Sequence, residues 1–220
     1  LKDENNYITL CAYDDLRSAN QPGGKQSPKY RSFGSYYTRT TGIWQTVWME
    51  FVNSSCFESI KITTNIETPS VTIGIKSTSD AVGKTASLET LWNEQPTGSA
   101  SVILGSTYTE VTILLNEKHL WEIGKGGLYD LNLTLSDSET VYDTVSSYFG
   151  LRSVYIDKKA FMINGKSVFG RWVLDQGFYP DGIYTAPTDA ALKTDIECSM
   201  QLGFNGARMH EKGFEPRYLY

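Results

Sequence analysis

The chain has 220 residues, enough for about one to two domains with a real core, and 40% of its residues are hydrophobic. Its formal net charge of −5 and its lack of basic runs argue against a surface for the phosphate backbone of nucleic acids. No apolar run approaches the roughly 18 residues that cross a bilayer, so we expect neither a nucleic-acid nor a membrane partner.

Cysteine and histidine residues are few and widely spaced. Cysteines occupy positions 11, 56 and 198 and histidines positions 119 and 210, so none has a CxxC or HxxxH spacing. We therefore expect no metal site, no other cofactor and no disulfide scaffold. Aromatic residues make up 13% of the chain, led by tyrosine. Such rings fill the cores of β-sandwiches, or they stack on sugar faces in open clefts, and both uses stay open at this point.

Residues 1–51 contain two candidate strands separated by a long loop. The first runs from Tyr7 to Tyr13 and the second from Gly42 to Phe51, where apolar side chains alternate along the segment. Between them, residues 14–34 are polar and rich in Gly, Pro, Ser and Lys, which predicts a loop. Because two strands bury too little surface to stand alone, residues 1–51 are expected to be part of a larger β domain.

Residues 52–148 show short bursts of alternating apolar residues separated by turn residues. Roughly seven such bursts within less than about a hundred residues are typical of an antiparallel β-sandwich. We expect its core to contain Val71, Ile73 and Ile75, then Val111, Ile113 and Leu115, and then Tyr129, Leu131, Leu133 and Leu135. No titratable cluster marks a site there.

After Gly150 the pattern changes from strands alone to strand, helix and strand. Asn164-Gly165 predicts a type I′ turn within a hairpin. Thr188 is placed to cap a helix that carries Leu192, Ile196 and Met200 at helical spacing and stops at Gly203, and residues 204–209 follow as a strand. This β-loop-α-β order over residues 168–209 is typical of the start of a parallel sheet or a (β/α)₈ barrel.

Four groups of motifs, in order along the chain, resemble glycoside hydrolase family 2, which contains β-galactosidases, β-glucuronidases and β-mannosidases. They are Tyr37-Thr-Arg39-Thr-Thr-Gly42-Ile-Trp44 continuing to Glu50, Leu120-Trp121 with Leu128-Tyr129-Asp-Leu131, Tyr148-Phe149-Gly150-Leu-Arg152 with Phe161-Met-Ile-Asn164-Gly165-Lys166, and Leu174-Asp175-Gln176-Gly177 with Asn205-Gly206-Ala-Arg208-Met-His210. Together they cover almost the whole chain.

The resemblance implies a mainly β fold with an immunoglobulin-like β-sandwich at its centre. Residues 1–51 would be the C-terminal part of a jelly-roll sugar-binding domain, residues 52–150 the immunoglobulin-like sandwich, and residues 151–220 the incomplete start of a TIM-barrel catalytic domain. The implied activity is hydrolysis of O-glycosyl bonds at the non-reducing end of β-glycosides, most simply in a β-galactosidase-like enzyme with a carbohydrate substrate. Association into homo-oligomers is left open.

The family uses a retaining mechanism with two Glu residues as acid/base and nucleophile. By resemblance both lie on later barrel strands, so we expect no catalytic residue in this chain and no activity from it alone. Asn93-Glu94 resembles the Asn-Glu pair at the family's acid/base, but it lies between sandwich strands, and we interpret it as an exposed turn. The alternative function is that of a non-catalytic carbohydrate-binding or scaffold module built from the same β domains.

Residues that follow the predicted barrel strands are the candidate substrate contacts, because active sites of these barrels lie at the carboxyl ends of the strands. Asp175 and Gln176 follow the first strand; the alternative for Asp175 is capping a loop. Arg208 can orient a carboxylate through its fork of donors, or it forms a structural salt bridge. His210 corresponds to a family histidine that hydrogen-bonds sugar hydroxyls, although family members often space this pair one residue wider.

A second group of candidate contacts lies in the N-terminal segment. Tyr36, Tyr37 and Arg39 occupy the place where, by resemblance, a jelly-roll loop reaches the mouth of the barrel. Relatives place an acid at this spot and this sequence does not, which puts its sugar specificity in question. The alternative is a pair of core aromatic residues beside a surface arginine.

Overall fold

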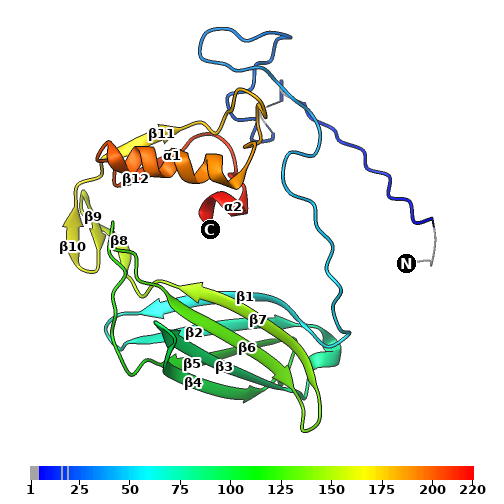
Figure 1. Cartoon of the computed structure of the whole chain (residues 1–220), viewed down its shortest axis with the longest axis vertical. Helices are drawn as coiled ribbons and strands as arrows, with labels where there is room; N and C mark the ends of the chain where they lie inside the picture. Colours follow the sequence, from blue (N-terminus) through cyan, green and yellow to red (C-terminus); the bar gives the residue numbers. More distant parts are fainter. Residues whose placement is uncertain (1–4, 16, 19) are drawn as a thin grey trace. The chain divides into compact units, whose positions relative to one another are not determined.

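The computed structural model describes residues 5–15, 17–18 and 20–220, and its regular structure is mainly β, which confirms the predicted fold class (Figure 1). The chain forms two compact units. One is Met49–Phe169, and the other combines Leu1–Trp48 with Gly170–Tyr220. These units do not follow the predicted boundaries at residues 51 and 150, and the assignment of three domains stays a prediction.

The unit formed by Met49–Phe169 contains a seven-stranded antiparallel sandwich. One sheet has the order β1-β2-β5 and the other the order β4-β3-β6-β7, and the chain crosses between them after β2, β4 and β5. The strands are β1 (Phe57–Asn65), β2 (Ser70–Ser77), β3 (Thr85–Trp92), β4 (Gln95–Ile103), β5 (Tyr108–Leu114), β6 (Tyr129–Ser136) and β7 (Val141–Phe149), with a short 3₁₀ helix at Ser79–Ala81. A three-on-four sandwich of this kind is immunoglobulin-like.

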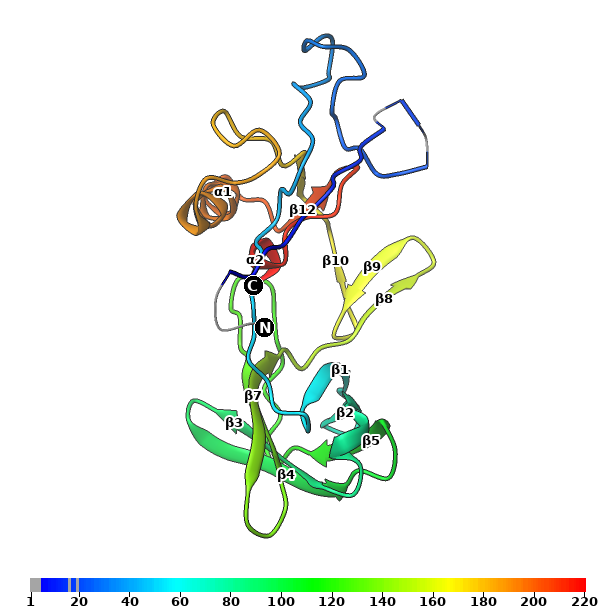
Figure 2. The same cartoon turned by 90° about the vertical axis from the view of Figure 1, so that its right-hand side faces the viewer.

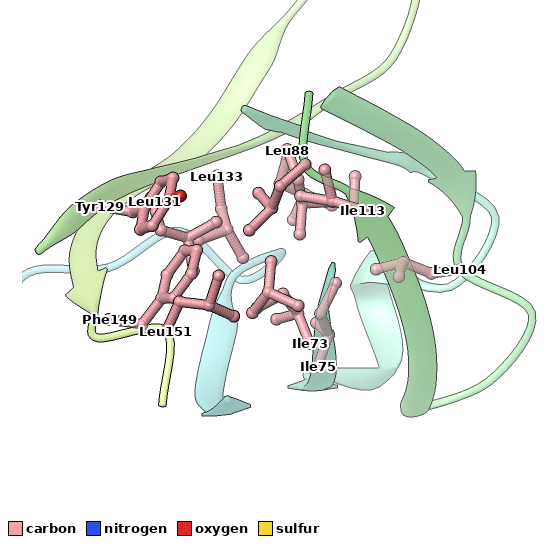
Figure 3. Close-up of a cluster of buried hydrophobic side chains, with 14 of the residues drawn as sticks. Ile73, Ile75, Leu88, Leu104, Ile113, Tyr129, Leu131, Leu133, Phe149 and Leu151 are labelled. Carbon is pink, nitrogen blue, oxygen red and sulfur yellow. The ribbon is translucent and has the colours of Figure 1, made fainter. Parts of the chain in front are cut away.

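Alternating apolar side chains form the core between the two sheets (Figure 3). All but one of the predicted core residues are buried there, and Val111 packs against them partly buried. Tyr129 is also fully buried. Its hydroxyl donates to the carbonyl of Glu117 and accepts from the backbone N–H of His119, at 2.9 and 2.8 Å, so the hydroxyl is paired although it lies in the core.

A small antiparallel meander follows the sandwich in the same unit (Figure 2). It consists of β8 (Val154–Asp157), β9 (Ala160–Ile163) and β10 (Lys166–Val168). Asn164 and Gly165, with φ of 50° and 75°, form the turn between β9 and β10, as the type I′ prediction requires. The Asn164 side chain donates to the carbonyl of Trp121 at 2.8 Å and accepts from the N–H of Ser153 at 3.0 Å, which anchors the turn to the sandwich.

The second unit contains the predicted strand-helix-strand order. It consists of β11 (Trp172–Asp175), α1 (Asp189–Gln201), β12 (Gly206–Met209) and a final turn of helix, α2 (Pro216–Leu219), and β11 pairs with β12 in parallel. The Thr188 hydroxyl caps α1 by accepting from the Ala191 N–H at 3.1 Å. One parallel pair agrees with the start of a barrel without establishing it.

The apolar residues of α1 differ in their burial. Leu192 is buried, whereas Ile196 is 39% and Met200 56% exposed. The predicted stripe therefore exists in the sequence, but only its first residue packs into the unit. Among the helices in the described part of the chain, none has the length and apolar character to cross a membrane.

The strands predicted at residues 7–13 and 42–51 are wrong for this structure. Over residues 5–15, 17–18 and 20–56 the described backbone contains isolated bridges but no strand. Tyr7 and Phe51 are 87% and 88% exposed. A strand also needs a neighbouring strand to receive its backbone hydrogen bonds, and within the described residues neither segment is paired in a sheet.

Truncation of a core side chain should destabilise the sandwich selectively. Leu133, on β6, is 1% exposed, so Leu133→Ala should lower the free energy of unfolding by about 2–5 kcal/mol through lost burial and a residual cavity. Leu114→Ala, at a position 65% exposed on β5, is the matched control and should change it by less than about 0.5 kcal/mol. Urea unfolding of the two variants measures the difference, and equal losses would contradict this account of the core.

Candidate functional site

The parallel pairing of β11 with β12 brings two predicted site residues together. Asp175 is the last residue of β11, and His210 follows β12 directly. The backbone N–H of His210 donates to the carbonyl of Asp175 at 2.8 Å. The two candidate residues at the ends of β11 and β12 therefore lie next to each other at the carboxyl edge of this strand pair.

The Asp175 carboxylate organises the loop that follows β11. Its Oδ1 accepts from the backbone N–H of Gly177 at 2.8 Å, and its Oδ2 accepts from the hydroxyl of Tyr218 at 3.0 Å. The loop-capping role considered for Asp175 is thus present. Burial and the negative charge of Asp175 raise the pKa of the Tyr218 hydroxyl, which keeps it protonated as the donor in this bond.

The His210 side chain is 9% exposed and has one ring nitrogen without a partner. Its Nε2 lies 3.5 Å from Oε1 of Glu211, whereas its buried Nδ1 has no hydrogen-bond partner among the described residues. Glu211 also lies 3.6 Å from the ammonium group of Lys25. Because buried polar atoms are nearly always paired, the Nδ1 atom is a candidate for contact with a ligand.

Arg208 lies on β12, opposite Leu174, and is exposed. Within residues 5–15, 17–18 and 20–220 its guanidinium has neither an ion-pair nor a hydrogen-bond partner. The structural salt bridge considered as its alternative role is therefore not formed among these residues. Its donors remain open to an anionic or hydroxyl-bearing group.

Tyr37 connects the N-terminal segment to the end of β11. Its hydroxyl donates to Oε1 of Gln176 at 2.8 Å, and its ring stacks on Phe178 with a centroid distance of 4.3 Å. The backbone around Tyr37 is fixed by two bonds, from its own N–H to the carbonyl of Lys25 and from the N–H of Ser27 to its carbonyl. Tyr37 therefore contacts Gln176, the residue that directly follows β11.

The other two aromatic and basic candidates of this segment contact different partners. The Arg39 guanidinium lies 3.9 Å from the centroid of the Tyr30 ring, and hydrogen bonding to it lowers the pKa of the Tyr30 hydroxyl. The Tyr36 ring stacks on Phe33 at 5.3 Å. No contact connects either side chain to Asp175 or His210 within the described residues.

Lys212 is the residue that sequence reasoning missed. Its ammonium group donates to the carbonyl oxygens of Gly177 at 2.7 Å and Tyr184 at 3.0 Å. Burial lowers its pKa to about 8, although the charges of Glu215 and Asp175 act in the opposite direction. Its position two residues after His210 was visible in the sequence, but the partners come from a distant loop.

A hollow of about 710 Å³ lies in the same unit and reaches the Tyr184 ring. Asp14, Gln26 and Thr41 supply polar groups to its wall, and Trp44 and Tyr184 supply aromatic ones. Aromatic faces beside hydroxyl and carboxylate groups suit a sugar, whose own faces are apolar and whose edges are polar. Within the described part of the chain, no three His, Cys, Asp or Glu residues gather in a way that could hold a metal ion.

Glu94 lies in an exposed turn between β3 and β4, as predicted. Asn93 and Glu94 have φ of 49° and 66° and form the two central positions of this hairpin. Both side chains are exposed. Asn93-Glu94 therefore has a structural explanation that needs no catalytic role.

Comparison with known proteins identifies the sandwich. Residues 55–152 match the family model described as glycosyl hydrolases family 2, which confirms the family resemblance of this segment. No curated protein sequence matches the chain.

Solved structures share the fold of this chain. A β-glucuronidase from Ruminococcus gnavus in complex with a C6-substituted uronic isofagomine matches with a TM-score of 0.66 and 15% identity, covering 76% of this chain and 27% of that one. Its complex with D-glucuronic acid has the same TM-score, identity and coverage of this chain, and 28% coverage of that chain. The chain thus spans little more than a quarter of these structures, and at this identity the likeness shows the fold alone.

The lowered pKa of Lys212 predicts how the stability of its unit depends on pH. The folded lysine releases its proton near pH 8 and the unfolded one near 10.5, so between these values the unfolded state binds more protons. The free energy of unfolding should therefore rise as the pH increases from about 8 toward 10. Above about 10 the half-buried tyrosines Tyr179 and Tyr218, whose pKa is raised, oppose this gain.

Urea unfolding at pH 7.5 and 9.5 tests this prediction, with Lys212→Met as the comparison. The gain in the wild-type protein should be absent in Lys212→Met, because the variant has no proton to release at this position. An equal gain in both proteins would assign the pH dependence to other groups.

Proposed function

We propose that this chain forms part of a retaining glycoside hydrolase that cleaves O-glycosyl bonds at the non-reducing end of β-glycosides. The observation that carries the proposal is the match of residues 55–152 to the family, followed along the chain by β11, α1 and β12. This order agrees with a sandwich preceding a (β/α)₈ barrel. The carboxyl ends of β11 and β12 would then face the substrate.

The proposed substrate contacts are Arg208, His210, Asp175, Tyr37 and Arg39. Support for Arg208 is its exposed guanidinium, and support for His210 is its buried Nδ1 atom, which lacks a partner among the described residues. Tyr37 and Asp175 gain support from their contacts with Gln176 and Gly177 at the end of β11. Arg39 is included among the proposed contacts only because of its place in the family motif.

The carboxylates near the strand ends are already committed to partners. Asp175 accepts from Gly177 and Tyr218, Glu215 pairs with Arg217 at 2.7 Å, and Glu211 lies beside His210 and Lys25. A retaining mechanism needs two carboxylates placed on either side of the sugar, one of them as a nucleophile. We therefore propose that the catalytic pair is not supplied by this chain.

For the sugar we propose a β-galactoside, as the motifs imply. The structural neighbours bind D-glucuronic acid and uronic isofagomine, so the competing substrate is a β-glucuronide, whose carboxylate would suit Arg208. The alternative function, a non-catalytic carbohydrate-binding module, is favoured by the committed carboxylates. Turnover of the two substrates by an enzyme that contains this segment separates these possibilities.

The chain by itself should not hydrolyse aryl β-glycosides. Without a pair of carboxylates the reaction loses orders of magnitude in rate, because the members of a catalytic unit act together. The purified chain is assayed with nitrophenyl β-galactoside, β-glucuronide and β-mannoside. Turnover that persists through purification and disappears in Glu94→Gln would contradict both the inactivity of the chain and the structural role of its Asn-Glu turn.

In an enzyme that contains this segment, Arg208→Ala and His210→Ala should each lower kcat/KM at least tenfold, about 1.4 kcal/mol of transition-state stabilisation. The galactoside and glucuronide are compared in the same assay, and a larger loss on the glucuronide in Arg208→Ala would favour recognition of a carboxylate. Lys193→Ala, on the exposed surface of α1, is the control. Unchanged kinetics in both variants would remove these residues from the site.

A further inference from the structure

Lys212 occupies a site built from three separate parts of the second unit. Its ammonium group donates to the carbonyls of Gly177 and Tyr184, which lie seven residues apart in the loop between β11 and α1. Lys212 itself lies in the loop between β12 and α2. The Lys212 side chain therefore connects two points of the loop between β11 and α1 to the loop between β12 and α2.

Four aromatic rings surround the same ammonium group. The distances from Nζ to the ring centroids are 4.0 Å for Tyr184, 5.0 Å for Trp44, 5.2 Å for Phe214 and 5.7 Å for Phe178. All lie within the range of about 6 Å over which a cation is attracted to a ring face. Trp44 belongs to the N-terminal segment, so the enclosure ties that segment to the strand ends as well.

Two glycines leave the space that the lysine and its enclosure need. A Cβ atom at Gly177 would lie 2.8 Å from both Cε and Nζ of Lys212, and φ at this residue is 65°. A Cβ atom at Gly24 would lie 3.2 Å from the Tyr184 ring. The backbone at Gly177 thus approaches the lysine as closely as a residue without a side chain permits.

No carboxylate neutralises the lysine within the described part of the chain. Its nearest acidic influences are Glu215, which pairs with Arg217, and Asp175, which bonds to Gly177 and Tyr218. Two carbonyl dipoles and four ring faces therefore hold the charge. Carbonyl oxygens and ring faces of this kind can also bind a free alkylammonium ion that replaces the lysine side chain.

We propose that Lys212 is a positioning residue of the candidate site, whose ammonium group holds the loop after β11 and the N-terminal segment in the arrangement that places Gln176 and Tyr37 at the strand ends. Gly177, one of its two acceptors, directly follows Gln176. Phe178, one of its four rings, stacks on Tyr37. The importance of this arrangement for a sugar rests on the proposed function, whereas the arrangement itself is testable without one.

Chemical rescue of Lys212→Ala tests the proposal in this chain. The substitution removes three methylene groups and the ammonium, which propylammonium replaces. The readout is amide hydrogen exchange, followed by NMR, at Gly177, Ile183 and Thr185, whose N–H groups bond within the loop. In Lys212→Ala we expect these amides to exchange at least about tenfold faster, with no change in the sandwich.

Propylammonium should restore slow exchange at these amides in a saturable manner, and 1-propanol, which has the same shape without the charge, should not. Lys193→Ala, at an exposed position on α1, is the matched control and should respond to neither compound. Gly177→Ala should loosen the same loop by displacing the Lys212 side chain. Propylammonium should not rescue this variant, because Lys212 and its own ammonium group are still present in the chain. If Lys212→Ala fails to fold, Lys212→Met keeps the aliphatic stem and should still loosen the loop.

Unchanged exchange in a folded Lys212→Ala or Lys212→Met protein would overturn the proposal, and so would equal rescue by propanol, which would reduce the lysine to a filler of space. Because these measurements use no sugar, their outcome does not depend on the glycosidase assignment. A loop that loosens and is rescued in this chain, together with no glycoside turnover by an enzyme that contains this segment, would refute the proposed function alone.

Discussion

An extended backbone needs a neighbour, because each N–H and C=O that leaves water must find a partner. This constraint decides which parts of the chain become sheets. Within the sandwich, seven strands pair with one another in two sheets and bury their alternating side chains between them. Residues 7–13 and 42–51 are paired with no strand among the described residues, and all of them except Trp44 are exposed. β11 and β12 find only each other.

The same constraint explains which features were predictable from the sequence. Alternation over Val71–Ile75 and Tyr129–Leu135 indicates both the strands and the buried face, because the signal is local and the neighbours exist. Thr188 and the Asn164-Gly165 turn were also predictable, since a cap and a hairpin turn are set by a few adjacent residues. The strands of the N-terminal segment were not, because pairing is not encoded in either segment alone.

The candidate site divides in the same way. Asp175 and His210 could be placed together because parallel strands align their carboxyl ends. The contact of Tyr37 with Gln176 joins residues 139 positions apart, and only the family motif pointed to it. The ammonium group of Lys212 is surrounded by the aromatic rings of residues 44, 178, 184 and 214. From the sequence alone, such residues are most simply assigned to a hydrophobic core. Nothing in their spacing indicates that they surround a cation.

The charged side chains near the ends of β11 and β12 differ in whether they already have hydrogen-bond partners. The carboxylates of Asp175 and Glu215 are used to fix loops, so they contribute order and are poorly placed to act as a nucleophile. Lys212 also fixes loops, but its charge is held by backbone carbonyls and aromatic rings, so it needs no carboxylate as a partner. Arg208 and the Nδ1 atom of His210 are then the polar groups of this edge that still lack partners among the described residues. The loops are therefore ordered by Asp175, Glu215 and Lys212. Among the residues that the resemblance assigns to the sugar, Arg208 and His210 are those whose polar groups remain unpaired within the described part of the chain.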